Sequence, residues 1–320
     1  MKLSVFAVLL QDKPFDEACA YLASQGVQAV EIGCGGFPGK DHCDPVELLN
    51  DDAKLEAFKS TLKKYNLDIA ALSSHGNAVH PDKAVAKQFH DDFENAVLLA
   101  EKLGVKTVVS FSGCPGGSPE DKTPNWVTCP WPDDFSHILE YQWNEVLIPY
   151  WKKEVEFCKA HGVRVAFEMH PGFCVYNPET LMKLRAAVGD TIGANFDPSH
   201  LFWQGIDPVA AIRYLGDAIY YFHAKDTKID EINTAANGVL DTKPYGDEIN
   251  RAWIFRSVGY GHSHQVWKDM MSALRMVGYD GCISIEHEDS LMTPGEGLSK
   301  AIAMLKDVMM FEDKGPMWWA

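Results

Sequence analysis

The sequence lacks long apolar runs and Cys-x-x-Cys motifs. No stretch approaches the ~20 consecutive apolar residues needed to span a bilayer. The apolar N-terminus, residues 1–10, is short and has no small-residue cleavage site, so we expect a strand there rather than a secretion signal. The eight cysteines are scattered along the chain, which is typical of a reduced cytoplasmic enzyme. We therefore expect a cytoplasmic protein without a membrane segment.

Positive charge is also scarce. The 29 Lys and Arg residues face 45 Asp and Glu residues, and the formal net charge is −16. This charge repels nucleic acids and anionic membranes, so we expect neither as a partner. Hydrophobic residues make up 46% and charged residues 23% of the chain, the balance of an ordinary globular protein. That balance excludes disorder as the dominant state.

Short β-branched runs alternate with longer amphipathic segments along the chain, a pattern typical of βα units around a parallel sheet. The expected strands are residues 3–9, 29–32, 69–72, 107–111, 163–167, 192–196, 219–222 and 282–285. The expected helices include residues 15–25, 51–65, 82–103, 139–160 and 178–188, with further helix starts at Asp207-Pro208 and Thr293-Pro294. Eight βα units predict a single (β/α)8 TIM barrel domain over residues 1–320.

Two connections are longer than ordinary βα loops. Residues 113–134 follow the fourth expected strand and are rich in Pro and Gly, and residues 224–261 follow the seventh. Both follow the strand ends that carry catalytic residues in such barrels, so we expect lids or specificity loops. The last four residues, Met-Trp-Trp-Ala at 317–320, are apolar for a tail. They predict docking on the barrel or on a neighbouring subunit.

The last four expected strands each end in a group that can bind a metal. These groups are Glu168, Asp197, His223 and Glu286. Each follows hydrophobic residues of the barrel wall, so all four side chains should project over one mouth. Three carboxylates at one mouth would repel each other strongly without a cation between them. Three oxygen ligands and one imidazole favour Mn²⁺, with Mg²⁺ or Co²⁺ as alternatives.

Five sequence blocks carry a family resemblance. They are Glu168-Met169-His170-Pro171, Asn195-Phe196-Asp197-Pro198-Ser199-His200, His223-Ala224-Lys225-Asp226, Arg256-Ser257-Val258-Gly259-Tyr260-Gly261 and Ile285-Glu286-His287-Glu288. In order and placement they resemble the xylose isomerase-like TIM barrel superfamily, in its sugar isomerase and epimerase branch, which includes ketose 3-epimerases and inosose dehydratases. The resemblance implies the same four metal ligands. It also implies that His200 touches the substrate and that Arg256 holds a substrate oxygen.

One position departs from the epimerase pattern. That pattern has a second Glu six residues after the first metal-binding Glu, and this sequence has Cys174 there. The departure argues against a simple ketose 3-epimerase.

The ligand set implies a mechanism. A divalent metal chelated by two adjacent sugar oxygens would polarise a carbonyl and stabilise the enediolate formed on deprotonation. Glu168 and Glu286 are the candidate catalytic residues that would move the proton. Bases on opposite faces of the planar enediolate give epimerisation, and a base on one face gives 1,2-isomerisation or β-elimination. We expect further substrate contacts from His75 at the end of the third strand and from His170 and Lys225 beside the ligands.

These observations predict a divalent-metal-dependent isomerase or epimerase of a small carbohydrate. The alternative is a metal-dependent lyase of keto-sugars, similar to inosose dehydratases or to the catalytic subunit of 3-keto C-glycoside deglycosidases, since Trp-rich loops suit a bulky leaving group. An apurinic endonuclease-like nuclease is less favoured because of the charge of −16. A non-catalytic sugar-binding barrel is the remaining alternative. We expect a homo-oligomer, with a small partner subunit as a further option.

Overall fold

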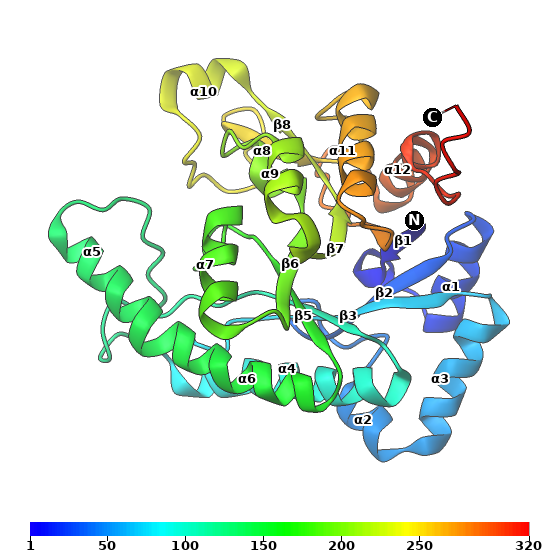
Figure 1. Cartoon of the computed structure of the whole chain (residues 1–320), viewed down its shortest axis with the longest axis horizontal. Coiled ribbons are helices and arrows are strands. Elements are labelled where there is room, and N and C mark those ends of the chain that lie inside the picture. Colours follow the sequence, from blue (N-terminus) through cyan, green and yellow to red (C-terminus); the bar gives the residue numbers. More distant parts are fainter. Residues whose placement is uncertain (320) are drawn as a thin grey trace.

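Eight parallel strands close a barrel in the computed structural model, which describes residues 1–319 (Figure 1). The order around the barrel is β1-β10-β7-β6-β5-β4-β3-β2. The strands are β1 (Lys2–Phe6), β2 (Ala29–Gly36), β3 (Asp68–His75), β4 (Thr107–Ser110), β5 (Arg164–Glu168), β6 (Ile192–Phe196), β7 (Ile219–Ala224) and β10 (Cys282–Ile285). Each overlaps a predicted strand, and the predicted TIM barrel is confirmed.

Helices surround the barrel. They are α1 (Phe15–Ser24), α2 (Pro45–Asn50), α3 (Asp52–Lys64), α4 (Lys83–Leu103), α5 (Asp133–Glu140), α6 (Ile148–Ala160), α7 (Pro178–Val188), α8 (Pro198–Phe202), α9 (Pro208–Leu215), α10 (Glu231–Asn237), α11 (His264–Met276) and α12 (Pro294–Val308). Local signals define their ends. The Asp82 side chain caps α4 by accepting two backbone N–H groups, and Gly104, with φ of 73°, ends that helix. Asp207 and Thr293 cap α9 and α12, as the sequence predicts.

Two predicted boundaries are wrong. The first strand ends at Phe6 because Ala7–Leu10 form a 3₁₀ turn. The helix expected over residues 139–160 begins earlier, with α5, and a π-helical segment (Tyr141–Leu147) joins α5 to α6. Pro149 lies in the first turn of α6 and has no backbone N–H to donate, so a wider turn precedes it.

The long connection after β7 has regular structure of its own. Within it, β8 (Asp226–Ile229) pairs antiparallel with β9 (Trp253–Arg256), and α10 lies between them. Figure 1 shows α10 projecting from the barrel at the edge of the view. Trp253 stacks on Trp203 at a centroid distance of 4.7 Å, which fixes the pair of strands beside the end of α8. The connection predicted as a lid or specificity loop is therefore a small lobe, whereas residues 111–132 after β4 form no helix or strand.

Hydrophobic side chains fill the space between the barrel and its helices. Inside the barrel, Ala71, Val109, Ala166 and Tyr221 form a smaller apolar cluster. The barrel also encloses fully buried polar side chains, which include Ser4, Glu31, Ser73, Asn195, His223 and Ser284. A buried polar layer requires internal partners, and these define the candidate site described below.

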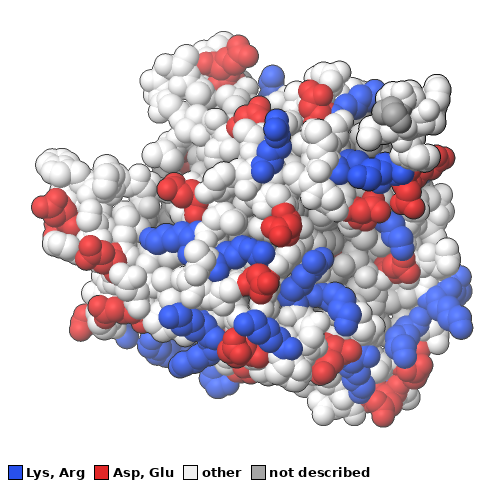
Figure 2. All heavy atoms as spheres, viewed as in Figure 1, with Lys and Arg blue, Asp and Glu red and all other residues white. Residues whose placement is uncertain are grey.

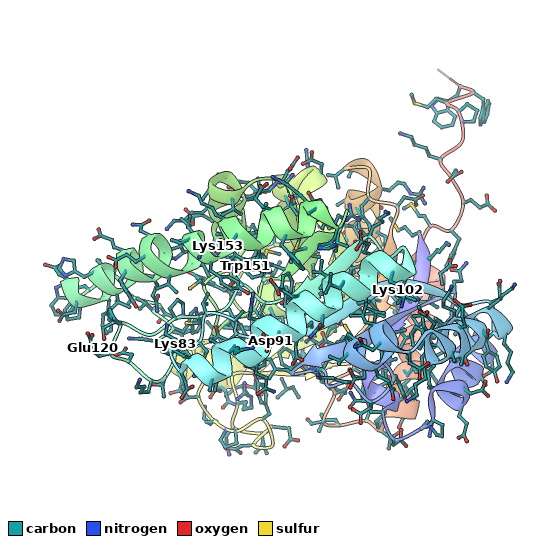
Figure 3. All side chains as sticks on the ribbon, turned by 90° about the horizontal axis from the view of Figure 1, so that it is seen from below. Lys83, Asp91, Lys102, Glu120, Trp151 and Lys153 are labelled. Atoms are coloured by element: carbon teal, nitrogen blue, oxygen red, sulfur yellow. The ribbon has the colours of Figure 1, made fainter. Side chains whose placement is uncertain are left out.

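The N-terminus is held against the barrel, whereas the C-terminal tail is exposed. The Met1 amino group lies 2.7 Å from Asp280 Oδ1. The tail extends away from the body in Figure 3, and Trp318 and Trp319 are 86% and 69% exposed. Docking of the tail on the barrel is thus wrong for residues 317–319, and Ala320 lies outside the described residues.

Acidic and basic side chains are interspersed on the face of the molecule that Figure 2 shows. Over residues 1–319, every helix is too short or too polar to cross a membrane.

Candidate metal and active site

The four predicted ligands come from four neighbouring strands. Glu168 is the last residue of β5, and His223 lies near the end of β7. Asp197 and Glu286 directly follow β6 and β10. One donor atom from each side chain lies within 4.8 Å of the others. The barrel therefore brings three carboxylates and one imidazole to a single point at its mouth.

The Asp197 carboxylate is fully buried and only partly satisfied. Its Oδ1 caps α8 by accepting the Ser199 backbone N–H at 2.8 Å, which fixes the side chain at the end of β6. Its Oδ2 accepts no hydrogen bond from residues 1–319, although Lys225 Nζ lies within ion-pair distance at 3.2 Å. Burial raises the pKa of Asp197 above its usual value. A bound cation would satisfy this oxygen and compensate for the burial of the charge.

The His223 imidazole lies between carboxylates on both sides. Its Nδ1 is 3.1 Å from Glu286 Oε2 and 3.2 Å from Glu168 Oε2. Its Nε2 lies 2.9 Å from Glu31 Oε1, inside the barrel. Burial lowers the pKa of His223, but the charges of Glu31 and Glu286 outweigh burial and raise it well above its usual value. Glu31 thus holds the Nε2 hydrogen, and a metal ion at Nδ1 would take the place of the other proton.

Lys225 is a buried cation at this mouth. Its Nζ lies 2.8 Å from Glu286 Oε2 and 2.9 Å from Glu288 Oε2, and the residue is 1% exposed. Burial lowers the pKa of Lys225, but the surrounding carboxylates outweigh burial and raise it well above its usual value. The ammonium group is therefore charged. Lys225 and a protonated His223 together do not balance the carboxylates of Glu31, Glu168, Asp197 and Glu286, so the donor set fits a divalent cation.

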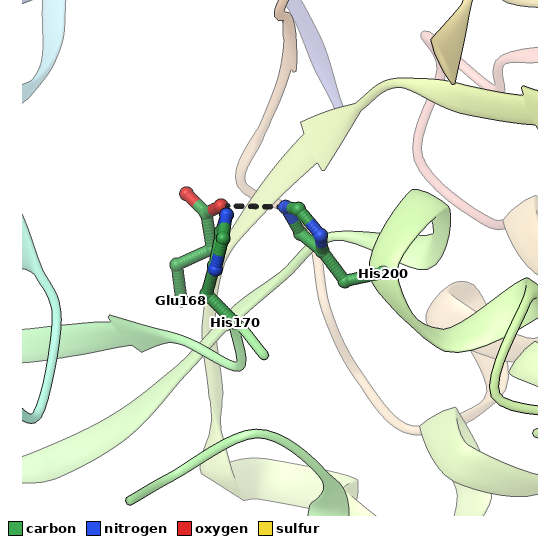
Figure 4. A group of neighbouring side chains, drawn as sticks. All are labelled: Glu168, His170 and His200. Carbon is green, nitrogen blue, oxygen red and sulfur yellow. Dashed lines mark hydrogen bonds and ion pairs between the residues drawn. The ribbon is translucent and has the colours of Figure 1, made fainter. Parts of the chain in front are cut away.

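Histidines surround Glu168. His200 Nε2 lies 3.0 Å from Glu168 Oε1, and His75 Nε2 lies 3.1 Å from Glu168 Oε2. Figure 4 shows the His200 contact, with the His170 ring beside it at a centroid distance of 4.0 Å. Burial raises the pKa of Glu168, but hydrogen bonds from His200, His223 and His75 outweigh burial and hold the pKa well below its usual range. Burial lowers the pKa of His170 and His200, so both rings are neutral near pH 7.

A cavity of about 210 Å³ opens onto these side chains. Its polar lining consists of Gln11, His75, Glu168, His170, Lys225, Glu286 and Glu288, and Phe6, Phe37 and Phe111 supply aromatic walls. A neighbouring cavity of about 430 Å³ shares His170 and Glu288 with it and is lined further by Tyr245, Ile254, Phe255 and Ser290. The two cavities together form a cleft with one polar and one largely aromatic part. A separate cavity of about 440 Å³, between the loop after β4 and α7, contains none of the four ligands.

The structure brings most of the predicted substrate contacts to this cleft. His75, His170 and Lys225 line the cavity, and His200 lies behind it against Glu168. Arg256 is placed differently. Its Nε donates to both oxygens of Asp289, at 3.1 and 3.0 Å, and it lines neither part of the cleft. Arg256 thus uses its Nε to hold a buried carboxylate, and its contact with a substrate oxygen stays a prediction.

The sequence of the whole chain matches known proteins. The model of the family described as xylose isomerase-like TIM barrel matches residues 19–308. The chain belongs to this family. A relative from Bacillus subtilis (strain 168), called Uncharacterized protein YfiH, is 42% identical over 312 residues, which are 97% of this chain and 99% of that protein. An inosose dehydratase from Clostridium botulinum (strain Eklund 17B / Type B) is 24% identical over 303 residues, 93% of this chain and 90% of that protein.

Solved structures share the barrel. A D-tagatose 3-epimerase-like protein superposes with a TM-score of 0.63 and 18% identity, covering 96% of this chain and 98% of its own. The IolI protein, solved with a binding zinc atom, has a TM-score of 0.65 and 18% identity with the same coverage. At these identities the structures support the fold alone.

Sequence reasoning missed two acidic residues. Glu31 was included in a predicted strand as a wall residue, yet it is fully buried and contacts His223. Asp289 also went unnoticed, although it accepts hydrogen bonds from Arg256 and from the Ser257 backbone. An acid within an apolar β-strand, as in Val30-Glu31-Ile32, is a signal that could have identified the first.

Proposed function

We propose that this chain is a divalent-metal-dependent isomerase or epimerase that moves a proton next to the carbonyl of a small carbohydrate. The observation that carries the proposal is the meeting of four donor atoms within 4.8 Å at the base of a cavity. We propose Mn²⁺ as the ion, with Mg²⁺ or Co²⁺ as alternatives. When bound, it supplies Lewis acidity that makes the hydrogen beside a carbonyl easier to remove.

In this proposal Glu168 and Glu286 carry the proton. Glu286 uses Oε2 for His223 and Lys225, while its Oε1 has no hydrogen-bond partner among residues 1–319, and the side chain lines the cavity. Glu168 is ionised and held in place by His75 and His200. We propose that both carboxylates exchange a proton with a carbon placed between them, Glu286 through its Oε1.

The remaining side chains bind and orient the substrate. Lys225 is charged and buried, so its ammonium group stabilises negative charge that develops on a substrate oxygen. His170, which is neutral because burial lowers its pKa, lines the cavity together with His75, and both rings can hydrogen-bond to sugar hydroxyls. The aromatic rings of Phe6, Phe37 and Phe111 exclude water from one wall.

A lyase acting on keto-sugars is the second candidate, and the neighbouring cavity of about 430 Å³ favours it. Tyr245 and Phe255 stack there at a centroid distance of 5.8 Å, a surface suited to a ring-shaped leaving group. The similarity to inosose dehydratases also supports this reading.

Product analysis separates the two activities. The metal-loaded protein is incubated with keto-sugars that carry or lack a substituent at the β-carbon, and products are followed by NMR. Isomers or epimers from both kinds of substrate support the first proposal. Unsaturated product without epimer refutes it in favour of the lyase, and binding without turnover across the panel refutes both.

A further inference from the structure

A second cluster of metal-binding groups lies outside the barrel, between α4 and α6. His90 and Glu94 are four residues apart on α4 and so lie on one face of that helix. Glu154 of α6 lies opposite them, and one donor atom from each side chain lies within 4.8 Å of the others.

The distances between the donor atoms of this cluster fit ligands arranged around an ion better than side chains that hydrogen-bond to each other directly. His90 Nε2 is 3.6 Å from Glu94 Oε1, and His90 Nδ1 is 3.8 Å from Glu154 Oε1. Both distances are too long for hydrogen bonds. Ligands at about 2.0–2.1 Å from a tetrahedral ion lie about 3.3 Å apart. An ion binds only one nitrogen of the His90 ring, and one donor atom from each of the three side chains already lies within 4.8 Å of the others, so small adjustments would place all three around one ion.

Glu154 supplies the independent reason to expect a ligand. The residue is 5% exposed, and its Oε2 has no hydrogen-bond partner within residues 1–319. A buried carboxylate without a partner is costly, and such groups are normally paired or bound to a metal. Burial raises the pKa of Glu154, and the charge of His90 offsets this only in part. The protein alone thus leaves this acid incompletely compensated.

The surrounding structure holds the cluster in place and leaves it accessible. Figure 3 shows α4 and α6 side by side, and Trp151 packs edge-on against Phe93 at 5.4 Å between them. The Tyr150 hydroxyl is 3.1 Å from His90 Nδ1, a contact that orients the imidazole as outer-shell partners of metal-binding histidines do. The His90 and Glu94 side chains are 32% and 37% exposed, so an ion can enter from solvent.

We propose that His90, Glu94 and Glu154 form a second site for a divalent transition-metal ion such as Zn²⁺, which cross-links α4 to α6. One imidazole and two carboxylates are ordinary zinc ligands, and water completes the coordination. None of the three residues lines the cleft at the barrel mouth, so the site is independent of the proposed activity.

The test counts metal ions on the full-length chain. The protein is stripped with a chelator, titrated with Zn²⁺ alone, separated from free metal and analysed by mass spectrometry of the metal content. His90→Gln and Glu154→Gln are each predicted to bind one equivalent of metal fewer than wild type. The affinity at the lost site should fall at least roughly 100-fold, because the loss of an outer-shell partner of a ligand already costs up to about this factor. Circular dichroism confirms that both variants are folded, and Co²⁺ reports the loss of an imidazole ligand in His90→Gln by its absorption bands.

His161→Gln is the matched control. His161 lies at the end of α6 and contacts Glu101 of α4 at 2.8 Å, so it also joins the two helices but has no third ligand. The His161→Gln variant is predicted to bind as many ions as wild type. Equal metal counts in wild type, His90→Gln and Glu154→Gln would overturn the proposal. Because the readout is a difference between variants, it does not depend on whether the barrel mouth binds a metal.

Discussion

Glu31 places both carboxylate oxygens against one nitrogen of His223, at 2.9 and 3.0 Å from Nε2. The Ser73 and Ser284 hydroxyls donate to the same carboxylate at 2.5 and 2.7 Å, so Glu31 is held on two sides. A carboxylate in this position fixes the ring orientation and raises the basicity of the nitrogen that faces the ligand cluster. The barrel interior thus supports the proposed metal site from below the cavity.

The first prediction concerns Glu31. Glu31→Gln removes the charge behind His223 and is expected to weaken Mn²⁺ binding by roughly 10- to 100-fold. Isothermal titration of the metal-free protein measures this. Glu17→Gln, an exposed position on α1, is the control and should bind like wild type. Wild-type affinity in Glu31→Gln would show that His223 does not depend on this contact.

The second prediction concerns metal removal. The buried carboxylates at the mouth repel each other, so chelation should lower the melting temperature and Mn²⁺ should restore it. At a concentration 100 times its dissociation constant, a bound ion adds about 2.7 kcal/mol to the free energy of unfolding. Thermal unfolding with chelator and with Mn²⁺ measures the shift. Asp197→Asn should lose most of it, and an unchanged shift in that variant would place the ion elsewhere.

The third prediction concerns the buried ion pair of Arg256 with Asp289. Burial raises the pKa of Asp289, but backbone hydrogen bonds from Ser257 and Leu291 and the Arg256 guanidinium outweigh it and lower the pKa below its ordinary 3.8. A lowered folded-state pKa stabilises the fold above the unfolded-state value, and this contribution is lost as pH falls through the folded-state value.

Asp289→Asn should therefore cost about 2 kcal/mol of unfolding free energy near pH 7. The difference from wild type should shrink as pH falls below about 4. Urea unfolding at several pH values measures both, with exposed Asp313→Asn as the control. A difference that grows toward acidic pH would contradict the assigned role of Asp289.

The fourth prediction concerns the aromatic part of the cleft. If it holds a second ring of the substrate, Tyr245→Ala should raise KM for keto-sugars with an aryl or sugar substituent by about tenfold, since loss of such stacking costs about 1.4 kcal/mol. Unsubstituted keto-sugars should be unaffected. Tyr214→Ala, an exposed position on α9, is the control. Equal effects on both kinds of substrate would indicate a general structural role for Tyr245.

The strands and the convergence of the ligands were predictable because both depend on local pattern. Apolar β-branched runs define the barrel wall, and Glu168, Asp197, His223 and Glu286 each close such a run. In a barrel, a residue that closes a strand lies at the mouth whatever its distance along the chain. Strand position alone was therefore enough to place these side chains near each other.

The missed features depend on contacts between distant segments. Glu31 and His223 are 192 residues apart, and no local spacing relates them. Arg256 is paired with Asp289, 33 residues later, so its motif could not reveal that Nε of the guanidinium holds this carboxylate. The strand of Trp253 forms because it pairs with β8 and stacks on Trp203, which are tertiary interactions.

The central claim is that Glu168 and Glu286 move a proton beside a carbonyl at a metal-supported site. Deuterium incorporation from D₂O into a panel of keto-sugars, followed by NMR, tests it most directly. Metal-loaded wild type is predicted to exchange the hydrogen next to the carbonyl, and Glu168→Gln, Glu286→Gln and chelator-treated protein should exchange it at least about 100-fold more slowly. Exchange that survives chelation or either substitution, or its absence in the metal-loaded wild type across the panel, would contradict the account.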